Sequence, residues 1–155
     1  MARRKRAEKR EILPDPVFKS TLAAKFINNI MGAGKKGVAE QIFYTAIDKI
    51  EEQTGDSGIE VFEKAIDNAS PILEVKSRRI GGATYQVPIE VDRARKKALA
   101  MRWILSSCRN TIGNRMPENL AEELIAASRG EGGAVRKKED VHRMAEANKA
   151  FAHFR

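Results

Sequence analysis

The side chains best suited to chemistry in this sequence are lysines and arginines between residues 74 and 99. One group precedes a Gly-Gly pair and a second follows an aspartate. The two groups are Lys76, Arg78 and Arg79, and then Arg93, Arg95, Lys96 and Lys97. Clustered cations of this kind bind the phosphates of nucleic acids by neutralising their charge. We therefore expect this stretch of the chain to contact a polyanion.

The second group of cations begins a predicted helix, where positive charge is unfavourable. Asp92 can cap that helix, which spans roughly residues 92–109, and the helix dipole is positive at this end. Each exposed cation there costs about 0.3–1 kcal/mol. A bound phosphate would meet both the cations and the free N–H groups of the first turn. We therefore predict that neutralising Arg95, Lys96 and Lys97 weakens binding while stability stays equal or rises.

The sequence shows few signs of a catalytic site or a metal site. Cys108 lies on the apolar stripe of residues 92–109, the usual place for an inert small side chain. His142 and His153 do not form a closely spaced ligand cluster with it. The carboxylates are scattered over predicted helix surfaces, without a pair placed for acid–base work. We predict that the protein is not an enzyme and uses no metal, cofactor or small-molecule substrate.

A glycine loop at residues 32–37 could suggest a nucleotide-binding loop, but its pattern does not fit. The sequence GAGKKG has no Ser or Thr after the lysines, and a helix precedes it where a P-loop requires a strand. We interpret the loop as the end of a helix, with Lys35 and Lys36 near a backbone phosphate.

The first group of cations lies on a predicted β-hairpin. Gly81 and Gly82 suit a two-residue turn in which both central residues have positive φ. Residue 78 then faces 85, 76 faces 87 and 74 faces 89. Pro88 has no N–H to donate and places the hairpin at an edge. We predict a protruding, marginally stable arm at 73–91, whose residues 75–87 are mobile in the free protein. The alternative is a surface hairpin whose charges only prevent aggregation.

The remaining sequence predicts about six amphipathic helices and a mainly α fold. Their expected starts and ends are Ser20 to Gly32, 36–53, Ser57 to Pro71, 92–109, Met116-Pro117 to the glycines at 130, 132 and 133, and 134–148. Glu60 completes a capping-box pattern with Ser57. In the fourth helix, apolar spacing predicts a buried stripe of Ala94, Ala98, Met101, Leu105 and Cys108.

Length and charge set the wider expectations. The 155 residues carry a net charge of +8, which indicates a nucleic acid or another anionic surface as partner. We expect a basic, disordered tail at 1–13 and a single domain at 14–155. One cysteine is typical of a reducing compartment, and there is no apolar run long enough for a membrane span or a secretory signal. We therefore expect a cytoplasmic protein.

Several long motifs resemble a known family. They are 15–20 (DPVFKS), 78–91 (RRIGGATYQVPIEV), 98–103 (ALAMRW), 135–140 (VRKKED) and 142–155 (HRMAEANKAFAHFR). Over essentially its full length the chain is similar to bacterial small-subunit ribosomal protein seven. The resemblance implies a helical domain with a protruding β-hairpin between the third and fourth helices.

The resemblance also implies partners. It points to primary binding of the 3′ major domain of small-subunit rRNA and to organisation of the subunit head. The arm, with Arg78, Arg79, Gly81, Gly82 and Tyr85, would lie near the exit-site tRNA and the mRNA path, among neighbouring head and platform proteins.

The family's rRNA contacts map onto four parts of this sequence. They are the tail, the glycine loop, the arm and the start of the fourth helix. The residues are Arg3, Arg4, Lys5, Arg6 and Arg10; Lys35 and Lys36; Lys76, Arg78 and Arg79; and Arg93, Arg95, Lys96 and Lys97, with Arg102, Arg109 and Arg115 as further candidates.

Two other classes of function stay open from the residues alone. An architectural DNA-binding protein could insert a basic β-ribbon into the minor groove, although such arms usually act as symmetric pairs and no dimer stripe is evident. A protein-interaction scaffold could have a merely cationic surface. Binding of structured RNA against duplex DNA would distinguish these classes.

Overall fold

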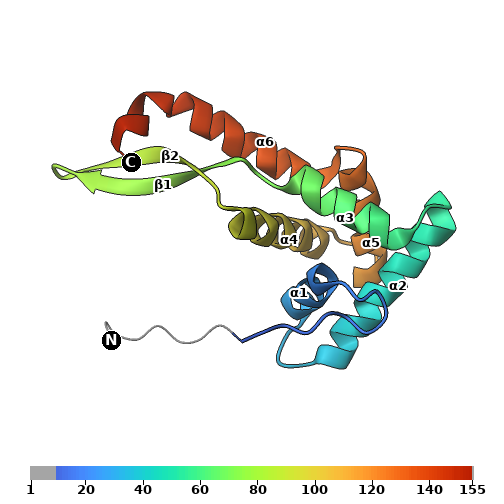
Figure 1. Cartoon of the computed structure of the whole chain (residues 1–155). Helices are drawn as coiled ribbons and strands as arrows, with labels where there is room; N and C mark the ends of the chain where they lie inside the picture. Colours follow the sequence, from blue (N-terminus) through green and yellow to red (C-terminus); the bar gives the residue numbers. More distant parts are fainter. Residues whose placement is uncertain (1–9, 155) are drawn as a thin grey trace.

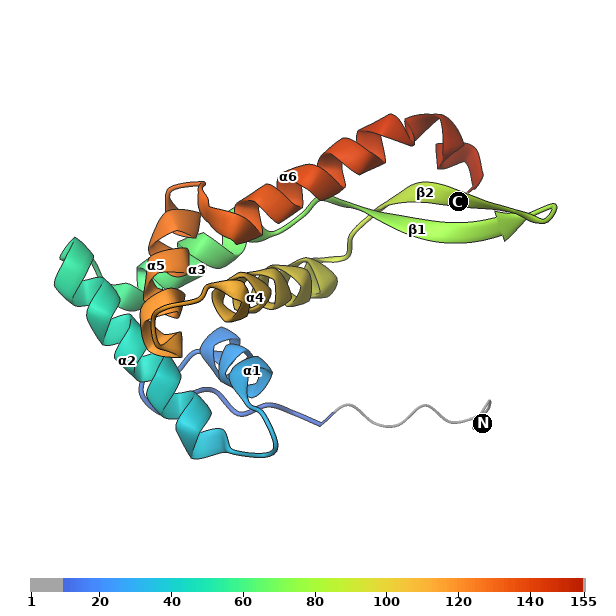
Figure 2. The same cartoon turned by 180° about the vertical axis from the view of Figure 1, so that it is seen from behind.

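The computed structural model describes residues 10–154 and confirms the mainly helical fold with its hairpin between the third and fourth helices (Figures 1 and 2). The first three helices precede the hairpin and three more follow it. The elements are α1 (Thr21–Ile30), α2 (Lys36–Thr54), α3 (Gly58–Ala69), β1 (Leu73–Ile80), β2 (Ala83–Glu90), α4 (Arg93–Asn110), α5 (Met116–Ser128), α6 (Gly132–Ala147) and the 3₁₀ helix η1 (Lys149–Phe154).

The core lies where the inner faces of the helices meet. Phe26 of α1, Phe43 of α2 and Phe62 of α3 are fully buried. Their ring centroids are 5.1 to 5.8 Å apart, within the range in which tilted and edge-to-face aromatic pairs are favourable. This cluster joins the first three helices, and α4 and α5 pack on them.

Local sequence signals set several helix ends correctly. The Ser20 hydroxyl accepts the N–H of Ala23 and the Asp92 carboxylate accepts that of Ala94, as expected for N-caps. The capping box at Ser57 is wrong, because the Ser57 side chain makes no cap bond. Glu51, from the preceding helix, accepts the Gly58 N–H at 3.0 Å in its place.

Helix α6 begins two residues earlier than the glycine pattern predicts. The Glu123 carboxylate of α5 accepts the N–H groups of Gly133 and Ala134, and also the Ser107 hydroxyl of α4. A carboxylate at a helix N-terminus satisfies free donors and favours the dipole. A Cβ on Gly133 would clash with the Ser107 hydroxyl, so glycine here permits the close packing of α6 on α4.

The hairpin has the predicted register. Arg78 pairs with Tyr85, Lys76 with Val87 and Glu74 with Ile89. Gly81 and Gly82 have φ of 56° and 89°, the left-handed values that a two-residue turn of this kind requires.

The arm is packed along part of its length. Val87 is fully buried, and the Tyr85 ring lies 5.3 Å from the ring of Phe151 in η1. Figure 1 shows α6 running beside the strands, with η1 folding back onto β2. The 3₁₀ helix η1 therefore docks on the arm through Phe151. The segment expected to be mobile narrows to the exposed tip around residues 76–84.

Candidate nucleic-acid interface

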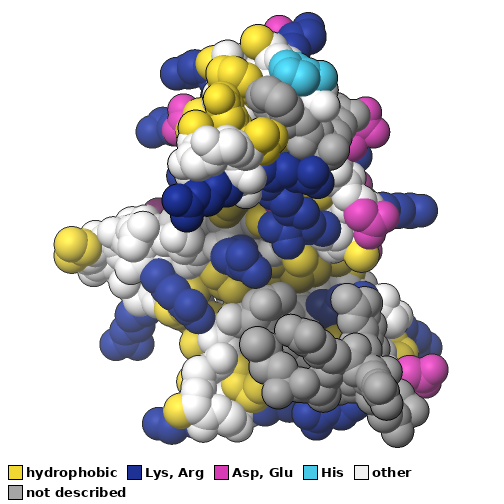
Figure 3. All heavy atoms as spheres, turned by 90° about the vertical axis from the view of Figure 1, so that its left-hand side faces the viewer, with side chains coloured by type: hydrophobic (Ala, Val, Ile, Leu, Met, Phe, Trp, Pro, Cys, Tyr) yellow, Lys and Arg dark blue, Asp and Glu magenta, His cyan; other side chains and the backbone are white. Residues whose placement is uncertain are grey.

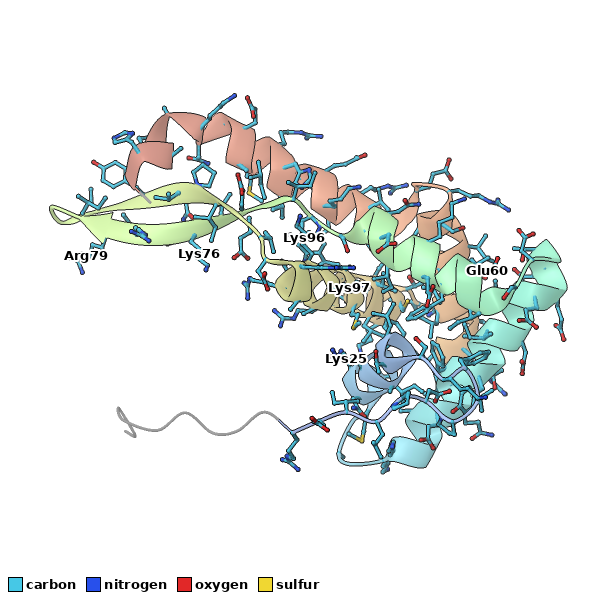
Figure 4. The ribbon with its side chains drawn as sticks, in the orientation of Figure 1. Lys25, Glu60, Lys76, Arg79, Lys96 and Lys97 are labelled. Atoms are coloured by element: carbon cyan, nitrogen blue, oxygen red, sulfur yellow. The ribbon has the colours of Figure 1, made fainter. Side chains whose placement is uncertain are left out.

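The predicted cations gather mainly on the side of the molecule where α4 begins and the arm leaves the helices. Figure 3 shows this side, with Lys and Arg side chains across its middle and a patch of apolar side chains beside them. In Figure 4, Lys96 and Lys97 lie at the start of α4, Lys25 lies on the neighbouring α1, and Lys76 and Arg79 follow the arm. Glu60 lies toward the other end of the molecule.

Arg95 has a structural partner within this basic side. Its Nε atom donates to both carboxylate oxygens of Glu74 at 2.8 Å, and Lys76 Nζ lies 3.5 Å from the same carboxylate. The Glu74 side chain is only 10% exposed, whereas that of Arg95 is 50% exposed. The pair joins the base of the arm to the first turn of α4, so part of the Arg95 charge is already compensated.

Lys96 and Lys97 are differently placed. Both are half-buried, and neither forms an ion pair within residues 10–154. Asp92 accepts one N–H of the first turn of α4. The two lysines therefore offer uncompensated positive charge at a helix start, the arrangement that favours a bound anion.

The other predicted cations are more dispersed. Arg78 and Arg79 are exposed on the arm before its turn, and Arg93 is exposed at the first position of α4. Lys36 pairs with Glu40 at 3.6 Å on α2. It also lines a hollow of about 840 Å³ with Arg10 and the segment 11–16. The glycine loop thus lies near the segment that follows the tail, and its hollow shares Ile12 and Asn28 with the hollow at the start of α4.

Further candidates have mixed placements. Arg102 and Arg109 line a hollow of about 430 Å³ with Asn29, and Arg109 also donates to the Ile30 carbonyl. Arg115 precedes α5, and its backbone N–H donates to the Glu118 carboxylate. Arg3, Arg4, Lys5 and Arg6 lie outside the described residues.

The structure adds one cation that sequence reasoning missed. Lys25 is exposed on α1 and lines the same hollow as Lys97 of α4. Its position on the polar side of a helix predicts only solvent exposure. The packing of α1 on α4 brings it to the basic side, and no local sequence signal reveals that packing.

The predicted buried stripe of α4 is partly wrong. Met101, Leu105 and Cys108 are buried as expected, but Ala94 and Ala98 are exposed. They form, with Leu22 and Met101, part of the lining of the hollow between α1 and α4. The apolar stripe therefore continues onto the surface next to Lys97.

A buried carboxylate fixes the direction of the chain after the tail. Asp15 is 3% exposed and accepts the N–H groups of Val17 and Phe18. The Tyr44 hydroxyl donates to it at 2.7 Å. Burial, with the bond to Asp15 as the next cause, raises the pKa of Tyr44 to about 12, so the hydroxyl stays protonated and this contact holds the segment against α2.

In residues 10–154, the remaining titratable groups offer no catalytic arrangement. Burial raises the pKa of the Cys108 thiol to about 12, which suits an inert core side chain. Among the described residues, no group of three or more His, Cys, Asp and Glu side chains is placed to hold a metal ion. No helix in that part of the chain has the length and apolar character needed to span a membrane.

His142 of α6 holds the chain at the base of the arm. Its Nε2 atom accepts the N–H of Ile72 at 3.0 Å, so the ring must be neutral with its proton on Nδ1. Burial, followed by the nearby Lys138 charge, lowers the pKa of His142 below its usual value. Protonation would remove the acceptor and break the bond.

Stability is therefore expected to fall as the pH is lowered. The unfolded chain takes up the His142 proton near pH 6.5, before the folded chain does. The stabilisation is full above that pH and is lost as the pH falls through the lowered folded pKa. We expect a loss of about 0.5–1.5 kcal/mol, the value of one hydrogen bond.

Thermal denaturation between pH 7.5 and 5.5 measures this loss. His142→Gln keeps an acceptor without a titrating group and serves as control. The prediction fails if both proteins have the same pH profile.

Comparisons with known proteins find similarity over nearly the whole length of the chain. A sequence model of the family described as "Ribosomal protein S7p/S5e" matches residues 2–149. The chain is 57% identical, over all of its length and 99% of the relative, to the small ribosomal subunit protein uS7 of Teredinibacter turnerae. It is 59% identical to that of Gemmatimonas aurantiaca and 56% to that of Solibacter usitatus, with the same coverage.

Proposed function

The chain belongs to the ribosomal protein S7p/S5e family, and from this membership we propose that it binds small-subunit rRNA through the basic side formed by the arm, α4 and α1. It is a protein of the small ribosomal subunit and not an enzyme. One observation carries the proposal: Lys96 and Lys97 lie at the start of α4 with no ion pair among the described residues, where both the helix dipole and their charge favour phosphate.

The finer roles extend this proposal. The family resemblance points to the 3′ major domain as the bound RNA and to organisation of the subunit head. The exposed tip of the arm, with Arg78 and Arg79 before Gly81-Gly82, is suited to reach a second nucleic acid. We assign this tip to the exit-site tRNA and mRNA path, and the start of α4 to the rRNA.

The rigid base of the arm supports that division of roles. Three contacts fix the arm relative to its neighbours. Glu74 pairs with Arg95 of α4, and His142 of α6 accepts the Ile72 N–H. The Tyr85 ring contacts Phe151 of η1. These contacts hold the base of the arm beside the start of α4, the proposed rRNA site, while the exposed tip extends beyond them.

The proposal is tested by comparing RNA with DNA. We expect the full chain to bind a fragment of the 3′ major domain at least tenfold more tightly than duplex DNA at about 0.15 M salt. RNA is recognised by its shape and its single-stranded loops, whereas charge alone would treat both polymers alike. Equal affinity would contradict specific rRNA binding and favour an architectural DNA-binding protein or a merely cationic surface.

A further inference from the structure

A groove between α1 and α4 combines an apolar floor with a cationic rim. It has a volume of about 360 Å³, and its apolar lining comes from Leu22, Ala94, Ala98 and Met101, with Ile12 from the segment before α1. The two alanines are exposed, so their small side chains leave the hollow open. The volume falls at the lower end of the range for small-ligand sites.

The rim of this groove carries positive and polar groups. Lys25 of α1 and Lys97 of α4 line it, as does the exposed amide of Asn28. No carboxylate is among the described residues that line it. Neither lysine forms an ion pair in the described part of the chain, so both can neutralise an anionic group of a ligand seated on the floor.

The groove continues toward the C-terminal half of α4. Asn29 lines both it and the neighbouring hollow, whose described lining includes Arg102 and Arg109 but no carboxylate. Lys97 and Arg102 are five residues apart, about 7.5 Å along the helix axis. They are also about 140° apart around the helix, so the two cations flank the floor, as phosphates on either side of a seated group would require.

We propose that this groove seats one unstacked base of the bound RNA, with the adjoining phosphates against Lys25, Lys97 and Arg102. The proposal rests on the proposed function and specifies what its surface recognises. An apolar peptide would leave the cations unused, and an intact RNA helix would present phosphates and leave the apolar floor exposed. An extruded nucleotide has a flat apolar face joined to an anion, and unpaired bases are the parts of RNA that proteins read by sequence.

The test fills the floor without changing the charge. In Ala98→Leu, the larger side chain should occupy the space of the base and weaken binding of the 3′ major domain fragment roughly tenfold, the loss expected for one seated base. The salt dependence should stay that of the wild-type chain, because no phosphate contact is lost. Ala94→Leu fills the same floor from the preceding turn and should act alike.

Ala147→Leu is the control, because Ala147 is likewise an exposed helical alanine but is the last residue of α6 and lies outside the groove. Its affinity for RNA should equal that of the wild-type chain. Thermal denaturation of each variant verifies folding, and Ala94→Leu decides the test if Ala98→Leu alone is unstable.

RNA with single abasic positions completes the test. At one unpaired position, loss of the base should weaken binding to the wild-type chain about tenfold and add nothing to Ala98→Leu, because both changes remove the same contact. The groove is not a base site if Ala98→Leu and Ala94→Leu bind RNA like the wild-type chain, or if no abasic position couples to them. In that outcome, tight salt-dependent binding of RNA over DNA would still support the proposed function.

Discussion

Replacing Lys96 and Lys97 with glutamine is expected to lower affinity for the rRNA fragment by roughly ten- to hundredfold at 0.15 M salt, because two phosphate contacts are lost. The slope of log affinity against log salt should fall by about two. The free energy of unfolding should stay equal or rise, since both cations oppose the helix dipole and neither has an ion-pair partner in residues 10–154. Titrations at several salt concentrations measure the change.

A charge-matched control separates this effect from a general loss of positive charge. Lys49 of α2, which pairs with Glu118, and Lys64 of α3 lie outside the groove between α1 and α4. Lys49→Gln with Lys64→Gln removes the same charge and should change RNA affinity less than threefold. Equal losses in the two double variants would show that net charge, and not the start of α4, determines binding.

Replacing Arg95 with glutamine is expected to act on stability as well as on binding. The substitution leaves Glu74, a nearly buried carboxylate, with Lys76 at 3.5 Å as its one ion-pair partner in residues 10–154. Loss of one partner from a fully buried pair costs about 3–5 kcal/mol, and we expect about 1–3 kcal/mol because Arg95 is half-exposed. Urea denaturation measures the loss.

Two further variants identify the cause. Arg93→Gln removes the same charge from the same helix turn, where Arg93 has no ion pair among the described residues. It should leave stability nearly unchanged. Adding Glu74→Gln to Arg95→Gln should recover part of the loss, because the unpaired carboxylate is gone. Similar stability of Arg93→Gln and Arg95→Gln would contradict a structural role for the Glu74–Arg95 pair.

These variants distinguish three cations at the start of α4 for which the sequence predicts the same role. Arg95, Lys96 and Lys97 are adjacent cations at one helix start, and from spacing alone all three are equivalent phosphate anchors. The pair between Arg95 and Glu74 joins residues 21 positions apart. The hairpin must be folded against α4 before that contact exists, so neither helix propensity nor charge pattern reveals it.

Features that depend on neighbouring residues were predicted well. Two glycines with positive φ fixed the hairpin register, and Ser20 and Asp92 marked helix starts because N-caps are local hydrogen bonds. Features that depend on distant packing were not. Glu51 replaced Ser57 at the start of α3, and α1 left Ala98 uncovered although apolar spacing predicted its burial.

The candidate site likewise has some features that are set by neighbouring residues and others that depend on distant packing. Most of its cations could be found from composition and position, because lysines and arginines at a helix start or on an edge hairpin stand out against local preference. Lys25 could not be found in this way, since it lies on the polar side of an amphipathic helix and its position predicts only solvent exposure. Only the packing of α1 beside α4 places it across a groove from Lys97.

Lysine modification read by mass spectrometry tests the central claim, that one side of the molecule binds the RNA. The chain is acetylated alone and in complex with the 3′ major domain fragment. We predict that Lys25, Lys76, Lys96 and Lys97 lose reactivity in the complex, whereas Lys49 and Lys64 keep theirs. Uniform protection of all six lysines, or protection of Lys49 and Lys64 alone, would contradict the account.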